Sequence, residues 1–116
     1  MDTAPALKTA LTRSGSRTTV TVAGEIDIDT VAELRQALAT ALSDGARLID
    51  VDFTDVAFCD CTGLAVLLRA GRYARARGAS LRVVNVTSSL VQRLFVTTRT
   101  ADVLSGPPSA RPLTPS

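Results

Sequence analysis

The sequence contains no histidine and no tryptophan, and only 3% of its 116 residues are aromatic. Without histidine, a nucleophilic serine or cysteine lacks its usual base. Zinc or iron would depend on two neighbouring cysteines with carboxylates, which is a poor tetrahedral ligand set. The phosphate-binding patterns GxxxxGK[ST] and GxGxxG are absent as well. These absences argue against an enzyme, a resident metal and a nucleotide cofactor.

Only two cysteines are present, Cys59 and Cys61, too few for a disulfide framework and too close together to join distant segments. No run reaches the roughly 18 to 20 apolar residues of a membrane span. The N-terminus also lacks the charged-then-apolar plan of a secretory signal. We therefore expect a cytoplasmic protein without a membrane partner.

Charge is small in total and uneven in distribution. A net charge of +2 with so few aromatic residues does not indicate a nucleic-acid partner. Nine of the 11 acids lie between Glu25 and Asp60, whereas the five arginines from Arg69 to Arg82 have no acid among them. Such a run is typical of the solvated face of a helix, with electrostatic steering of a partner as the alternative.

Hydrophobic residues make up 46% of the chain and are mostly aliphatic, which suits helices packed on a sheet in one domain. Periodicity and turn signals predict strands over residues 7–12, 17–24, 46–53 and 81–86, and helices over 30–42, 64–77 and 88–96. This order predicts an α/β fold with a mixed sheet of four to five strands and helices packed against it.

Several local details accompany this prediction. Gly24 is expected to end the second strand, and Gly71 to let its helix pack closely on the sheet. Leu90 and Leu94, together with Phe95, are expected to face inward from the last helix, which Ser88 or Ser89 caps. The domain is expected to span residues 1–105, with its core in about 20–104, before a disordered Pro/Ser-rich tail at 106–116.

The stretch FCDCTGL, residues 58–64, lies where the third strand gives way to a helix, the end of a strand that ligands favour. Cys59 is expected to be a small buried hydrophobe, with redox signalling as the alternative. Cys61 and Thr62 fall at the helix N-terminus, where unpaired N–H groups and the helix dipole would stabilise a thiolate or a phosphate.

The neighbouring residues have alternative roles. Thr62 is expected to cap the helix or to accept a phosphate, and Asp60 can cap it as well or offer a carboxylate to a metal held by a partner. Gly63 would let the backbone of a partner approach closely.

These residues resemble a known family. GEID at residues 24–27 is similar to the GELD turn of STAS domains of the anti-sigma factor antagonist type, a bacterial family. DCTGL at residues 60–64 is similar to the DSSGL or DSTGL of the same family, and the helix, strand and helix that follow match it in order and spacing. The similarity covers roughly residues 20–104.

The resemblance implies a single STAS-like domain that regulates transcription by partner switching. The unphosphorylated antagonist binds an anti-sigma factor, often a serine kinase of histidine-kinase-like ATPase fold, and so frees a sigma factor. Phosphorylation ends the binding, and a phosphatase that reverses it is a further candidate partner.

Carried over residue by residue, the family pattern assigns partner binding to five positions, namely Asp27, Asp60, Cys61, Thr62 and Gly63. The family's acceptor position is occupied by Cys61, and a thiol is not a normal substrate for a serine kinase. Thr62 is then the candidate acceptor, with its side chain rotated by about 100° around the helix. The alternative function is a STAS-type sensing or scaffold module that responds to redox state through Cys61.

Overall fold

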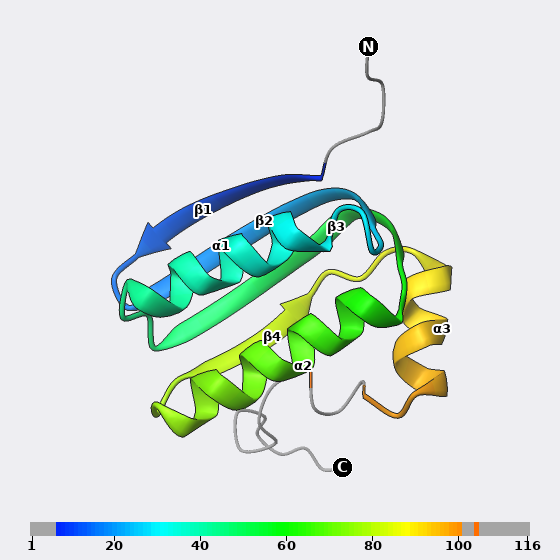
Figure 1. Ribbon diagram of the computed structural model, residues 1–116. Coiled ribbons are helices and arrows are strands. Elements are labelled where there is room, and N and C mark those ends of the chain that lie inside the picture. The colour runs from blue at the N-terminus through cyan, green and yellow to red at the C-terminus, as the bar shows by residue number, and fades with distance from the viewer. Residues whose placement is uncertain (1–6, 101–103, 105–116) are drawn as a thin grey trace.

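The computed structural model describes residues 7–100 and Leu104, which form one sheet with helices packed against it (Figure 1). The elements are β1 (Lys8–Ser14), β2 (Arg17–Ile26), α1 (Val31–Ser43), β3 (Leu48–Cys59), α2 (Cys61–Ala76), β4 (Ser80–Val84) and α3 (Ser89–Thr97). The predicted tail at 106–116 lies outside the described residues, so the tail and the domain limits stay predictions.

Within the described residues the sheet has four strands in the order β1-β2-β3-β4, which confirms the predicted mixed sheet at the lower of its two strand counts. β1 pairs antiparallel with β2, whereas β2, β3 and β4 run parallel to one another. Helices α1 and α2 lie side by side across one face, and α3 packs against β3 (Figure 1). The carboxyl ends of the three parallel strands therefore meet at one edge of the sheet.

Alternation along β2 explains which face receives the helices. Val20 and Val22 are fully buried, whereas the alternate positions Thr19 and Thr21 are half-buried on the other face. α1 contributes Leu34 and other apolar residues spaced three or four apart, as an amphipathic helix must to cover such a face. The core formed in this way is mostly aliphatic, with Phe53 and Phe95 as its aromatic members.

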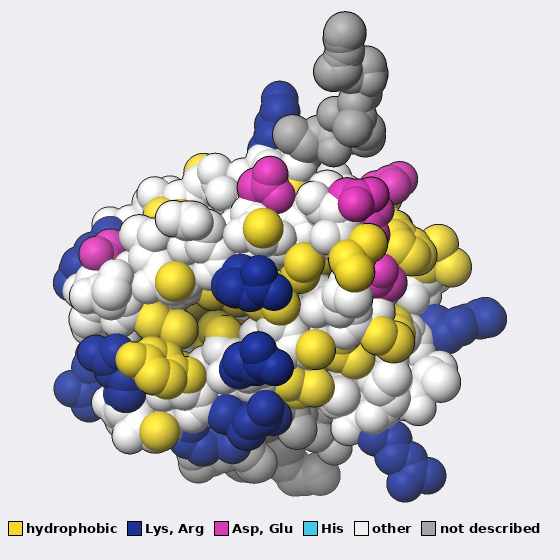
Figure 2. All heavy atoms as spheres, in the orientation of Figure 1, with side chains coloured by type: hydrophobic (Ala, Val, Ile, Leu, Met, Phe, Trp, Pro, Cys, Tyr) yellow, Lys and Arg dark blue, Asp and Glu magenta, His cyan; other side chains and the backbone are white. Residues whose placement is uncertain are grey.

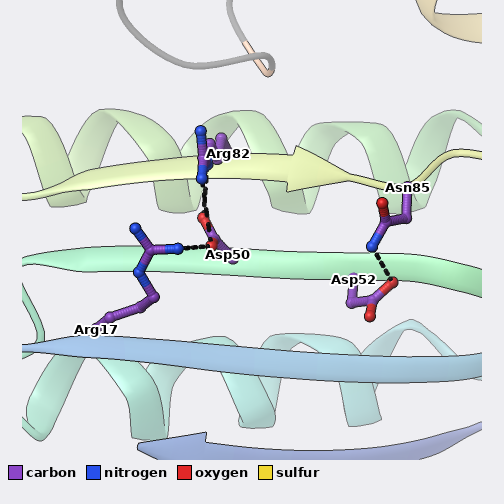
Figure 3. Close-up of polar contacts among 5 residues, drawn as sticks. All are labelled: Arg17, Asp50, Asp52, Arg82 and Asn85. Carbon is purple, nitrogen blue, oxygen red and sulfur yellow. Dashed lines mark hydrogen bonds and ion pairs between the residues drawn. The ribbon is translucent and has the colours of Figure 1, made fainter. Parts of the chain in front are cut away.

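The opposite face of the sheet is polar and is held by ionic contacts (Figure 3). Asp50 is only 6% exposed, and its carboxylate accepts hydrogen bonds from Arg17 Nη1 at 2.9 Å and from Arg82 Nε at 2.7 Å. The hydrogen bond to Asp50 raises the pKa of the Arg82 guanidinium. Alongside, Asn85 Nδ2 donates to Asp52 at 3.2 Å. These contacts join β2, β3 and β4 across their shared face.

The end of β2 was wrongly predicted. The strand continues past Gly24 to Ile26, because Gly24 adopts a φ of 122° and the pairing with β3 shifts between Gly24 and Glu25. A glycine inside a strand can mark such an irregularity without ending the strand. With these extra residues β2 ends at Ile26, which pairs with Cys59, the last residue of β3.

Two packing predictions were also wrong. A Cβ atom at Gly71 would meet nothing within 4 Å, so this glycine serves no close approach. Leu90 is 61% exposed, and Val91 takes the inward position, because it lies four residues before the buried Phe95 and so on the same helix face. Phe95 is buried as predicted, with its ring 6.3 Å from that of Phe53, and Leu94 is half-buried.

None of the helices in the described part of the chain has the length and apolar character that crossing a bilayer demands.

Candidate functional site

Two turns lie side by side at the carboxyl edge of the sheet, one after β2 and one after β3 (Figure 1). Parallel pairing brings Ile26 opposite Cys59, and the backbone N–H of Asp60 donates to the carbonyl oxygen of Ile26 at 3.1 Å. The turn that carries Asp27 and the helix start that carries Asp60 are thereby joined, although the two acids are 33 positions apart in the sequence.

Asp60 is the N-cap of α2. Its Oδ1 accepts hydrogen bonds from the backbone N–H groups of Thr62 at 2.9 Å and of Gly63 at 3.3 Å. The Thr62 hydroxyl donates to the same oxygen. Of the two capping candidates, Asp60 therefore holds the position, and α2 begins at Cys61, so that Cys61 and Thr62 lie at the helix N-terminus as predicted.

The second acid, Asp27, organises the turn that leads into α1. Its Oδ1 accepts from the backbone N–H of Asp29 at 2.9 Å and of Thr30 at 3.2 Å. The Thr30 hydroxyl accepts from the Asp27 N–H at 3.0 Å and donates to the Glu25 carbonyl at 2.7 Å. These bonds fix Asp27 at the surface next to Asp60's helix start.

Gly63 is buried inside the domain, which corrects its predicted role. A Cβ atom there would lie 2.5 Å from Ile26 Cγ2 and 2.7 Å from Cys59 Sγ. The glycine is required by the packing of α2 against its own sheet, so it does not offer an open backbone to a partner. It still supports the site indirectly, because it lets the two turns approach each other.

The two cysteines are in opposite environments. Cys59 is 4% exposed, which confirms the buried hydrophobe that we predicted, and burial together with the charge of Asp60 raises the pKa of its thiol to about 12. Cys61 is exposed as the first residue of α2. The family's acceptor position is thus presented to solvent, whereas Thr62 one residue later is half-buried and bonded to Asp60.

The buried Cys59 is expected to make stability depend on alkaline pH. A thiol whose folded pKa is raised stabilises the fold fully below its unfolded value, here 9.0, and that contribution is lost as pH rises towards about 12. The free energy of unfolding should fall across this window by at most ~1.4 kcal/mol per pH unit from this group. In urea denaturation at several pH values, Cys59→Ala should show a shallower fall, and equal slopes would contradict the assignment.

Sequence reasoning missed three exposed apolar side chains at the same edge, Ile28, Phe58 and Leu90, which are 73%, 39% and 61% exposed. Ile28 follows Asp27, and Phe58 precedes Cys59. Ser88 Oγ donates to the carbonyl oxygen of Ala57 at 3.1 Å, which ties the start of α3 to this part of β3. The isolated apolar residue in the acidic run DIDT was the available signal for Ile28.

Acidic side chains gather at the end of the molecule where β2 leads into α1, with hydrophobic side chains beside them (Figure 2). Arginines occupy the surface over α2 in the same view. Within residues 7–100 and 104, no group of three or more Cys, Asp or Glu side chains is placed to hold a metal ion. The acidic and hydrophobic side chains at the carboxyl edge of the sheet together provide apolar contact area and negative charge. This combination is suited to binding another protein.

The family model and the relatives that match this chain agree with one another. The family model described as "Mlab, STAS domain" matches residues 9–105. The chain is 34% identical to the anti-sigma-B factor antagonist of Bacillus subtilis (strain 168) over 85 residues, which cover 73% of this chain and 76% of the relative. It is 33% identical to the protein of the same name from Staphylococcus aureus (strain NCTC 8325 / PS 47), over 73% and 78% of the two chains.

Solved structures share the fold. The anti-sigma factor antagonist SpoIIAA in its unphosphorylated form superposes with a TM-score of 0.69 at 23% identity, over 81% of this chain and 83% of that one. An anti-sigma factor antagonist from Mycobacterium paratuberculosis superposes with a TM-score of 0.67 at 23% identity, over 95% and 86%.

Proposed function

Because this chain belongs to the STAS domain family, we propose that it is an anti-sigma factor antagonist, which binds an anti-sigma factor and so frees a sigma factor for transcription. The observation that carries the proposal is the junction of the two turns, where Asp60 N–H bonds to Ile26 and so sets Asp27 beside the helix start. The proposed binding residues at this junction are Asp27, Asp60, Cys61 and Thr62.

The contact surface proposed for the partner is the carboxyl edge of the sheet. Ile28, Phe58 and Leu90 would supply apolar area that becomes buried on binding, and the acids around them would orient the partner. The proposed partner is a serine kinase of histidine-kinase-like ATPase fold, opposed by a phosphatase, in the cytoplasm. On this proposal the protein acts by binding and is not itself an enzyme.

A phosphate on Thr62 would act against this binding through electrostatics. It would add about −1.5 to −2 charges next to Asp60. The hydroxyl that now donates to the Asp60 carboxylate would be replaced by a second anion, so the helix start would have to rearrange. Burying the added charge in an apolar interface would also cost desolvation free energy.

Thr62→Glu is therefore expected to weaken binding to the anti-sigma factor by about tenfold, whereas Thr62→Ala should stay within about twofold of wild type. The measurement is capture of partners from the native cytoplasm by all three proteins, then titration of the partner recovered. Intact mass of the recovered wild-type protein reports any added phosphate.

Each alternative outcome of this experiment has a distinct meaning. Equal capture by all three proteins without added phosphate would contradict a switch at Thr62 and leave an antagonist that always binds. Failure of the wild-type protein to capture any ATPase-fold anti-sigma factor would contradict the antagonist function itself.

A redox-responsive module is the second candidate function. It is favoured by the thiol of Cys61, which is exposed to solvent, whereas the nearby Cys59 is buried. If the protein has this function, oxidant treatment would change the capture of partners by the wild-type protein and would not change their capture by Cys61→Ala. An identical response of the two proteins would count against it.

A further inference from the structure

A groove of about 370 Å³ runs between α1 and α2, away from the turns described above. Its floor is apolar and is contributed by both helices, with Leu38 and Leu42 from α1 and Val66 and Ala70 from α2. All four side chains are 9% exposed or less, so the floor is formed by side chains of the hydrophobic core. Figure 2 shows the hollow between the two helices, with hydrophobic side chains in its floor and basic side chains at its edges.

The rim of the groove is cationic. Arg35, Arg69 and Arg77 line it, and among the described residues its lining contains no Asp or Glu. In the described part of the chain the ion pairs are those of Arg17 and Arg82 with Asp50, so the three rim arginines carry no acidic partner there.

Tyr73 positions one of these arginines. Its hydroxyl accepts a hydrogen bond from Arg77 Nη1 at 3.0 Å, and the guanidinium carbon lies 5.3 Å from the centroid of its ring. Both residues line the groove and both are exposed. The rim thus combines an aromatic face with guanidinium donors in a defined arrangement.

We propose that this groove binds a single-chain fatty acid, with the alkyl chain along the apolar floor and the carboxylate at the arginine rim. The volume falls at the low end of the range of about 300–1,000 Å³ for ligand pockets, which suits one chain and not two. Guanidinium groups bind carboxylates in a bidentate geometry, and no acid among the described lining residues opposes an anion. This ligand site goes beyond the antagonist function and uses another surface.

The single tyrosine of the chain gives a direct probe of this groove. Tyr73 lines it and there is no tryptophan, so intrinsic fluorescence reports on its occupancy. Monomeric laurate is expected to change the emission saturably and to give a matching isotherm by calorimetry. Neither effect is expected with acetate, which has the carboxylate alone. Neither is expected with dodecyltrimethylammonium, which has the same alkyl chain with the opposite charge. Equal binding of the cationic amphiphile would overturn the proposal.

Matched variants then test the two parts of the site. Arg69→Gln should weaken laurate binding by about fivefold to tenfold, since one charge-assisted contact is lost. Ala39→Leu, at an exposed position of the lining, should weaken it by filling space. Arg93→Gln, exposed on α3 and outside the lining, is the control and should bind as wild type does. If Arg69→Gln and Ala39→Leu both bind laurate as tightly as wild type, the proposal fails.

Other occupants of the groove would give different results. If a second copy covered it, sedimentation would show a dimer without ligand, and Ala39→Leu would dissociate that dimer; this result would overturn the fatty-acid site. Absence of any laurate isotherm would overturn it as well. Neither result bears on capture of an anti-sigma factor, so the two proposals fail separately.

Discussion

Replacing Gly63 with valine is expected to lower the free energy of unfolding by about 1–3 kcal/mol. Even the first added carbon would lie 2.5 Å from Ile26 Cγ2 and 2.7 Å from Cys59 Sγ, and both neighbours are buried. α2 would have to move away from the sheet, or β2 and β3 would have to shift. Urea denaturation of the purified protein measures the change.

Gly71→Ala, in the same helix, is the matched control. A Cβ atom at Gly71 would meet nothing within 4 Å, so the substitution adds helix propensity without a clash. It is expected to raise the free energy of unfolding by about 0.5–1 kcal/mol. If Gly63→Val and Gly71→Ala change stability in the same direction, the close approach at Gly63 does not govern the packing of α2.

Asp60→Ala is expected to have the largest effect on function. The substitution removes the cap that holds the N–H groups of Thr62 and Gly63, at a cost of about 1–2 kcal/mol in stability. The helix start would fray at the junction with the Asp27 turn. On the proposed function, capture of the anti-sigma factor should then fall by at least about tenfold.

Asp60→Asn separates the helix-capping role of residue 60 from its negative charge. Asparagine caps helices about as well as aspartate, so stability should stay within about 0.5 kcal/mol of wild type. Partner binding by Asp60→Asn then reports the contribution of the negative charge alone. Unchanged stability of Asp60→Ala would contradict the capping role, and full partner binding by Asp60→Ala would contradict the proposed surface.

On the proposed function, the geometry at the helix start bears on whether a kinase could act at Thr62. The exposed position is held by Cys61, and the nearest hydroxyl, that of Thr62, is bonded to the Asp60 carboxylate. A kinase would have to break that bond before transferring a phosphoryl group to Thr62. The exposed thiol has no such constraint, which makes the comparison of Thr62 and Cys61 variants informative in the same capture experiment.

Local patterns in the sequence determined the elements and their order. Alternation in β2, the 3.6-residue spacing in α1 and α2, and the serine before α3 each depend on neighbours within one turn or strand. The mixed sheet and its parallel neighbours followed from that order, because a helix between two strands imposes a crossover. The buried Cys59 and the acids at the ends of β2 and β3 were likewise predictable.

The tertiary structure alone decided how distant segments meet. Two pairing shifts between β2 and β3 kept Gly24 inside a strand, carried β2 opposite Cys59 and left Phe58 partly exposed. The side chains of Ile26 and Cys59 lie so close to Gly63 that this position packs inside the domain. The groove exists only because α1 and α2 pack beside each other. These contacts join residues far apart in sequence, and the free energy of packing them selects one arrangement that no local pattern encodes.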